Sequence, residues 1–106
     1  MTLIQCPECG AKFEREAKRG TPRQFCTPEH KRAFFRLMAK RGAVLAPLAL
    51  AWRGGKHKRS DNSSYALTQM AALVDVWRAE DRDAGRDAGL IVTRKRASGW
   101  IAADLA

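Results

Sequence analysis

Hydrophobic and polar positions along the chain predict a short N-terminal hairpin followed by a mainly helical region. Two short extended segments, Leu3–Ile4 and 11–15, flank a turn that holds Pro7 and Gly10. Much later, apolar residues recur every three or four positions over 65–83, which is the pattern of one face of a long helix. The expected fold class is therefore small α+β, a hairpin plus a helix followed by a mainly α-helical extension.

The middle of the chain contains helix signals separated by glycine and proline. Thr27–Pro28 combines a capping residue with a proline suited to the first helical position, and Gly42 is a typical stop, so a first helix is expected between them. The apolar run over 43–53 predicts a second helix packed on the first, with Pro47 tolerated only near its first turn. Glycines and polar residues over 54–64 predict a basic linker.

All three cysteines and one of the two histidines stand in a metal-ligand pattern. Cys6 and Cys9 form a C-x₂-C pair, and Cys26 and His30 follow as a second pair four positions apart. Three thiolates and one imidazole are a complete ligand set for tetrahedral, structural zinc, so we expect one structural Zn²⁺ ion. A C-x₂-C knuckle on a hairpin, with a second pair at a helix start, is the treble-clef arrangement. His57 is the rival histidine, but it has no neighbouring cysteine.

A family resemblance supports this interpretation. The stretch FCTPEHKRAFF resembles the FCS-x-x-C-R knuckle of small bacterial treble-clef zinc proteins. The ligand layout within residues 4–38 is similar to that of the small zinc proteins that inhibit DNA gyrase, and more loosely to MYND-type knuckles. His30 stands where a cysteine is usual, and the helices expected after Arg41 have no counterpart in the gyrase inhibitors. The resemblance implies a treble-clef finger and a partner among DNA-processing enzymes.

Together these patterns divide the chain into consecutive segments. We expect a treble-clef zinc finger over 1–42, a second helix over 43–53, a basic linker over 54–64, and a long helix with its tail over 65–106. Within the tail, Leu90–Arg96 suggests a short strand or an extended arm.

Positive charge is concentrated in the half of the sequence that contains the metal pattern. The net charge is +9. Residues 1–60 carry fourteen Lys/Arg and four Glu, a net charge of +10, whereas residues 61–106 carry a net charge of −1. A zinc module in a positive field indicates a polyanionic partner, nucleic acid in the simplest case, although basic proteins of this size also use charge for solubility alone.

Two groups of basic residues are the candidate nucleic-acid contacts. One is a row at helical spacing on the expected first helix: Arg32, Arg36 and Lys40. The other is a cluster in the linker: Lys56, Lys58 and Arg59. Such residues can follow phosphates, and arginine can also form a bidentate contact with phosphate or guanine. The alternative is a solvated helix face and a solvated linker.

Residue chemistry argues against an enzyme. A closed Cys₃His site leaves no coordination position for water or substrate. The sequence also lacks a glycine-rich phosphate loop and the His-x-Glu element of zinc deaminases. We therefore expect a non-enzymatic, regulatory protein that binds nucleic acid, DNA in particular. The alternative is a zinc knuckle that binds an acidic protein surface and modulates a DNA-processing enzyme such as gyrase.

Several features indicate the cytoplasm and no membrane association. An odd number of cysteines committed to a metal fits a reducing compartment, and the N-terminus lacks the basic-then-apolar pattern of a secretory signal. The longest near-apolar run, 43–52, is ten residues with an internal proline, too short to cross a bilayer. No motif for a small-molecule substrate is present.

Overall fold

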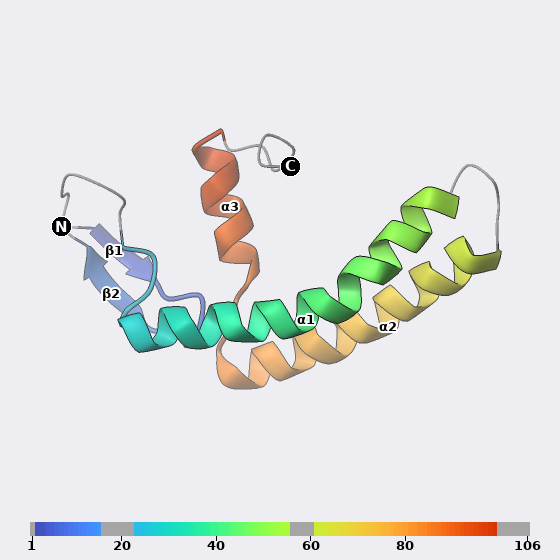
Figure 1. Cartoon of the computed structure of the whole chain (residues 1–106). Coiled ribbons are helices and arrows are strands. Elements are labelled where there is room, and N and C mark those ends of the chain that lie inside the picture. The colour runs from blue at the N-terminus through green and yellow to red at the C-terminus, as the bar shows by residue number, and fades with distance from the viewer. Residues whose placement is uncertain (1, 16–22, 56–60, 100–106) are drawn as a thin grey trace. The chain divides into compact units, whose positions relative to one another are not determined.

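The structure, a computed structural model, describes residues 2–15, 23–55 and 61–99. The described elements, in chain order, are β1 (Thr2–Gln5), β2 (Lys12–Arg15), α1 (Pro28–Gly55), α2 (Asp61–Ala84) and α3 (Gly89–Ala97) (Figure 1). A two-stranded antiparallel hairpin with three helices confirms the small α+β class and its mainly helical remainder.

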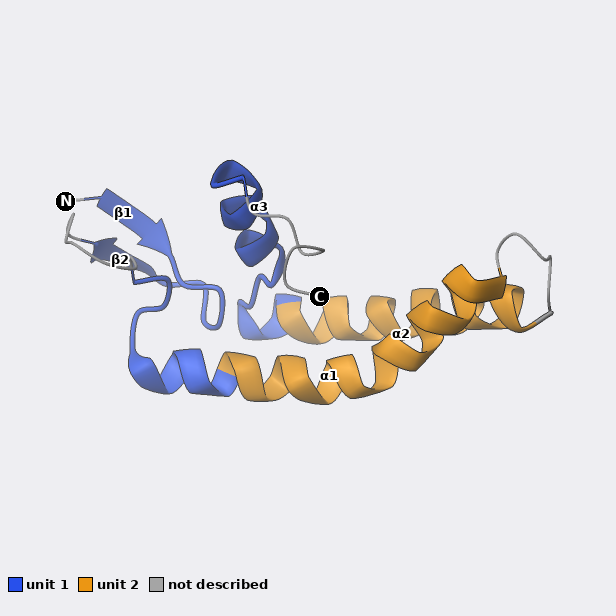
Figure 2. Cartoon of the chain, turned by 45° about the horizontal axis from the view of Figure 1, so that its top comes forward, with its two compact units in different colours: residues 1–33, 82–106 blue, residues 34–81 orange. Residues whose placement is uncertain are grey.

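The chain divides into two compact units that do not follow its sequence order. The first unit combines residues 1–33 with residues 82–106, and the second contains residues 34–81 (Figure 2). The first unit therefore holds the hairpin, the start of α1 and α3. Two segments that are about fifty residues apart in sequence belong to the same unit, which the predicted division into consecutive segments did not include.

The hairpin of the first unit has the predicted strands in a simple register. β1 pairs antiparallel with β2, and Ile4 lies opposite Phe13, so the two apolar side chains are partners across the strands. The guanidinium carbon of Arg23 lies 4.8 Å from the centroid of the Phe13 ring, a cation–π contact. Residues 16–22, most of the loop expected between the hairpin and Cys26, lie outside the described residues.

The predicted start of α1 is confirmed, and its predicted end is wrong. The Thr27 hydroxyl accepts a hydrogen bond from the His30 backbone N–H at 3.1 Å, and Pro28 is the first helical residue. The helix then runs through Gly42 and Pro47 to Gly55, so residues 43–53 are not a separate second helix. Glycine permits a stop but does not enforce one, and a proline inside a helix removes one backbone hydrogen bond and can kink the helix without ending it.

The second unit is a pair of helical segments from α1 and α2. Its fully buried apolar residues, among those described, include Phe34 and Ala66. The Arg41 guanidinium is also buried: it donates to both carboxylate oxygens of Asp81 at 2.8 and 2.9 Å and lies 5.2 Å from the centroid of the Trp77 ring. The Ser63 hydroxyl donates to the Trp52 carbonyl at 2.9 Å near the other end of the pair.

The long helix predicted over 65–83 is confirmed as α2, which begins slightly earlier, at Asp61. Parts of the predicted linker over 54–64 are helical: residues 54 and 55 belong to α1, and residues 61–64 belong to α2. Residues 56–60 lie outside the described residues. No helix in the described ranges is both long enough and apolar enough to cross a membrane.

The tail segment Leu90–Arg96 is helical, so the predicted strand or extended arm is wrong. α3 covers Gly89–Ala97, and three basic residues occupy its last turn, where the helix dipole favours positive charge. In so short a segment the sequence pattern does not separate strand from helix, and tertiary contacts override weak local preferences. These contacts join α3 to residues that lie next to the metal-ligand cluster.

Candidate metal centre

The four predicted ligands come together in the first unit. The thiol sulfurs of Cys6, Cys9 and Cys26 and a ring nitrogen of His30 all lie within 4.8 Å of one another. Cys6 is completely buried, and the other three are partly buried. The cluster could therefore hold one metal ion, as the spacing of the cysteines and the histidine predicts.

The first pair of ligands is placed by the tight turn after β1. The Gly10 N–H donates to the Cys6 carbonyl at 2.9 Å, and the Cys6 N–H donates to the Ala11 carbonyl at 2.8 Å. Gly10 has φ +79°, a left-handed conformation that glycine adopts without strain. The turn brings Cys9 back beside Cys6, so both sulfurs point to the same space.

The second pair is placed by the N-terminus of α1. Phe25, directly before Cys26, is buried and anchors the approach to the helix. The Thr27 cap then fixes the first turn, in which His30 directs its ring toward the cysteine four positions earlier: the His30 Nδ1 atom lies 3.0 Å from the Cys26 sulfur. The local signals of a capped helix therefore also position a ligand.

One sulfur–sulfur distance matches a tetrahedral zinc site, whereas the sulfur–nitrogen distance at His30 is shorter than such a site requires. With Zn–S bonds of about 2.3 Å, two sulfurs of a tetrahedral site lie about 3.8 Å apart. The sulfurs of Cys9 and Cys26 are 3.7 Å apart. The sulfur–nitrogen distance at His30 is a hydrogen-bond distance, shorter than the roughly 3.6 Å expected for two ligands of one zinc ion, so a bound ion requires a small outward shift of the ring.

The cluster already stabilises negative charge on one sulfur. Burial alone would raise the pKa of Cys6, but backbone N–H groups of Cys26, Cys9 and Glu8, together with the His30 ring, donate to its sulfur and lower the pKa to about 6. Burial raises the pKa of Cys26 to about 11, and the neighbouring sulfurs of Cys9 and Cys6 add to the rise. A cation at the centre would favour the thiolate form of all three.

Residues from the C-terminal part of the first unit surround the first knuckle. The Glu8 carboxylate, between the two cysteines of the C-x₂-C pair, accepts from the Arg86 guanidinium at 2.8 and 3.4 Å, and both side chains are largely buried. The Asp87 N–H donates to the Pro7 carbonyl at 2.8 Å. The backbone at Gly85 (φ +75°) approaches so closely that a Cβ atom added there would lie 2.8 Å from the Cys9 carbonyl oxygen.

Arg94 of α3 contacts the chain just before each pair of ligands. Its guanidinium donates to the backbone carbonyls of Gln5 and Gln24 at 2.5 and 3.2 Å, and to the Gln24 side-chain oxygen at 3.0 Å. Burial lowers the pKa of Arg94, and the nearby charge of Arg15 lowers it further, although an arginine of this kind stays charged.

The candidate nucleic-acid residues are only partly placed by the structure. Arg32, Arg36 and Lys40 are exposed at four-residue spacing on α1, and Arg32 lies 3.4 Å from the Glu29 carboxylate, an exposed contact of little energetic weight. Lys56, Lys58 and Arg59 lie outside the described residues, as does the rival ligand His57.

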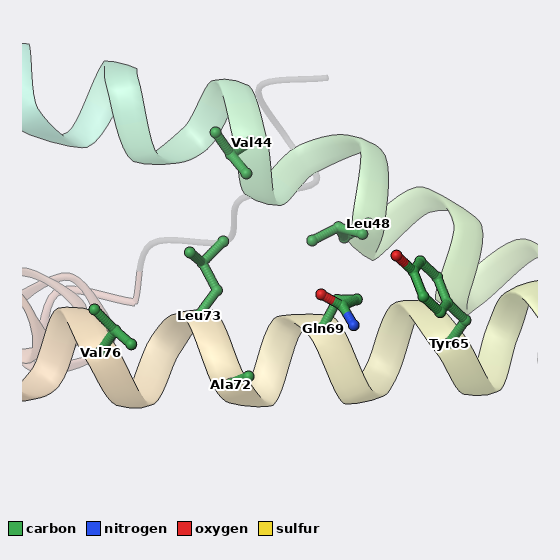
Figure 3. Close-up of a pocket in the computed structure, with 7 residues that line it drawn as sticks. All are labelled: Val44, Leu48, Tyr65, Gln69, Ala72, Leu73 and Val76. Atoms are coloured by element: carbon green, nitrogen blue, oxygen red, sulfur yellow. The ribbon is translucent and has the colours of Figure 1, made fainter.

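The second unit carries an apolar groove that the sequence patterns did not predict. Val44 and Leu48 of α1 face a row on α2 at three- and four-residue spacing (Figure 3). The α2 lining residues are Tyr65, Gln69, Ala72, Leu73 and Val76. Val44, Tyr65 and Val76 are each more than half exposed, so the groove is open to solvent.

Comparison of the chain with protein-family models, with curated proteins and with solved structures finds no match. The site must therefore be interpreted from its own chemistry. Sequence reasoning found all four metal-ligand candidates but missed the residues that surround them. Glu8, Arg86 and Arg94 look like ordinary surface charges, because their partners lie 70 to 89 positions away in sequence. The available signal was the pair Gly85 and Gly89, two glycines that break the pattern after a long helix.

Proposed function

We propose that this protein is a small, non-enzymatic, zinc-binding protein of the treble-clef type that binds nucleic acid, DNA in particular. The observation that carries the metal assignment is the cluster of Cys6, Cys9, Cys26 and His30, with ligand atoms within 4.8 Å of one another. Three sulfurs and one nitrogen favour zinc over the hard cations, which prefer oxygen. Four protein ligands complete a tetrahedral ion, so the ion has a structural role and leaves no position for substrate.

The case for nucleic acid rests on charge and exposure. The chain carries a net charge of +9, and the row of Arg32, Arg36 and Lys40 is exposed along one side of α1. Residues four apart on a helix are about 6 Å apart along its axis, so the row can contact successive phosphates. Because this contact is electrostatic, we expect the affinity for nucleic acid to fall steeply as the salt concentration rises.

The experiment is an electrophoretic shift with zinc-loaded protein, duplex and single-stranded DNA, and a salt series. We expect Arg36→Gln combined with Lys40→Gln to weaken binding and to reduce the salt slope by about two, one for each lost phosphate contact. The matched control, Arg53→Gln combined with Arg78→Gln, removes two charges from exposed positions outside the row; Arg53 lies on the same helix about 140° around its axis from Lys40. Absence of binding at low salt, or an equal effect of the control, would contradict the nucleic-acid proposal.

A second candidate is a zinc-stabilised module that binds a protein, such as a DNA-processing enzyme. The observation that favours it is the open apolar groove between α1 and α2, with Val44, Tyr65 and Val76 more than half exposed. A partner recovered by affinity capture after nuclease treatment, and lost with Val44→Asp or Val76→Asp but retained with Arg36→Gln, would favour this function over DNA binding.

A further inference from the structure

The metal-ligand cluster is built from two chain segments that a third segment holds together. Cys6 and Cys9 lie on the turn between the strands, whereas Cys26 and His30 lie at the start of α1. The third segment, residues 85–97, comprises Gly85, the turn that follows it, and α3. We propose that residues 85–97 are a positioning element of the metal site, and that Arg94 sets the distance between the two ligand pairs.

Arg94 is placed to do this through the backbone adjacent to the ligands. Gln5 directly precedes Cys6, and Gln24 stands two positions before Cys26. One guanidinium donates to the carbonyls of both residues. The guanidinium is a planar, rigid group whose N–H donors have fixed directions, so the two carbonyls are held at a fixed separation. A shift of either knuckle away from the metal position would break one of these hydrogen bonds.

The charge of Arg94 also suits a loaded site. Three thiolates and one Zn²⁺ ion leave one net negative charge at the centre, and Arg94 is close enough to Cys6 for the two charges to interact. A lysine would keep the positive charge but lacks the planar guanidinium whose N–H groups donate to both carbonyls. The geometry and the charge can therefore be tested separately.

Arg86 and Asp87 of the same segment hold the loop between Cys6 and Cys9. The Glu8–Arg86 ion pair holds the loop between Cys6 and Cys9, and the Asp87 N–H donates to the Pro7 carbonyl in that same loop. A bidentate ion pair with both side chains largely buried restricts the loop more than an exposed pair would. Segment 85–97 therefore contacts the backbone on both sides of the cluster.

This inference rests on the proposed zinc binding. Outer contacts that orient the ligands of a metal site are typically worth 10- to 100-fold in metal affinity. We therefore expect Arg94→Gln to weaken Zn²⁺ binding about 10- to 100-fold, measured by competition with a chromophoric chelator. Arg94→Lys should restore part of the loss. The absorption spectrum of the Co²⁺-loaded Arg94→Gln variant should show a distorted tetrahedral site, a change that loss of overall stability alone would not produce.

The matched control is Arg96→Gln, which removes the same charge from an exposed position of the same helix. It should leave both Zn²⁺ affinity and the Co²⁺ spectrum unchanged. Equal Zn²⁺ affinity of the Arg94→Gln and Arg96→Gln variants would overturn the inference. If the unaltered protein binds no zinc, the proposed function itself fails, which is a distinguishable result.

A second pair of variants covers the case in which Arg94→Gln does not fold. In the double-mutant cycle of Glu8→Gln and Arg86→Gln, losses of Zn²⁺ affinity that are not additive show that the ion pair acts on the site as a unit. Additive losses, or no loss in either variant, would count against a positioning role for segment 85–97.

Discussion

At the scale of single residues, two glycines of the first unit bring their backbones close together. Gly10 and Gly85 both have positive φ, and a Cβ atom on Gly10 would lie 2.5 Å from the Gly85 carbonyl oxygen. Neither obstacle is a flexible side chain, so an added methyl group can be accommodated only by moving backbone. The turn that carries Cys9 and the turn that precedes α3 therefore fit together only with hydrogen at both positions.

We expect Gly85→Ala to destabilise the zinc-loaded protein by more than the roughly 1–2 kcal/mol cost of a left-handed alanine, because the clash with the Cys9 carbonyl is added to it. Denaturant unfolding of the zinc-loaded protein measures the loss. The control is Gly99→Ala, which has φ +78° but no atom within 4 Å of the added Cβ, and so reports backbone strain alone. Equal losses for the two variants would show that the contact between the glycines is not tight.

The candidate metal ligands were predictable residue by residue, and the residues that support them were not. A C-x₂-C pair and a Cys-x₃-His pair are local patterns that indicate metal binding from the sequence alone. Arg94 and Arg86 have no such local pattern, because each acquires its role from an acceptor in a segment more than seventy positions earlier. Only the folded chain distinguishes Arg94, which contacts two backbone carbonyls, from Arg96, which is exposed in the same helix.

At the scale of elements, α1 differs most from its prediction. Both Gly42 and Pro47 are inside the helix, where local rules favour an end or a restart. Arg41, directly before Gly42, is held in the second unit by Asp81 and by the Trp77 ring. This anchor on α2 stabilises the helical backbone at the position where glycine would otherwise allow it to end.

Because Gly42 lies inside a helix, replacing it with alanine should raise the stability of the protein. The same substitution at a glycine that ends a helix would lower it. No atom lies within 4 Å of a Cβ added at Gly42, so Gly42→Ala should stabilise the protein by up to about 1 kcal/mol, the difference in helix propensity. A rise in the thermal unfolding temperature of the zinc-loaded protein would measure it. If Gly42 instead ended a first helix in the left-handed conformation, the same substitution would lower that temperature.

At the scale of the whole molecule, charge is distributed differently in space than along the sequence. By sequence, residues 1–60 carry the whole positive excess. By unit, residues 1–33 with 82–106 carry a net charge of +5, and residues 34–81 carry +4. The two divisions differ because the chain returns to its N-terminal unit after residue 81. Both units therefore contribute to the positive field proposed to attract nucleic acid.

The two units should also differ in their dependence on the metal. The buried residues described in the first unit are few, among them Cys6, Pro7 and Phe25, so hydrophobic burial alone supplies little stability there. The binding free energy of structural zinc, about 10–16 kcal/mol in zinc-finger peptides, acts as folding free energy in such a unit. The helical pair of residues 34–81 has its own buried contacts, including Phe34, Ala66 and the Arg41–Asp81 ion pair.

Removal of zinc with a chelator should therefore destabilise the first unit more than the second. Hydrogen exchange measured by mass spectrometry can show which amides lose protection. We expect amides of β1, β2 and α3 to lose protection together, because segment 85–97 and the hairpin meet at the same cluster. Amides of α2 within 61–81 should retain more of their protection. Added zinc should restore the original pattern, which controls for damage by the chelator. Loss of protection in the hairpin with α3 unchanged would show that α3 docks independently of the metal, and uniform loss would show that the two units unfold as one.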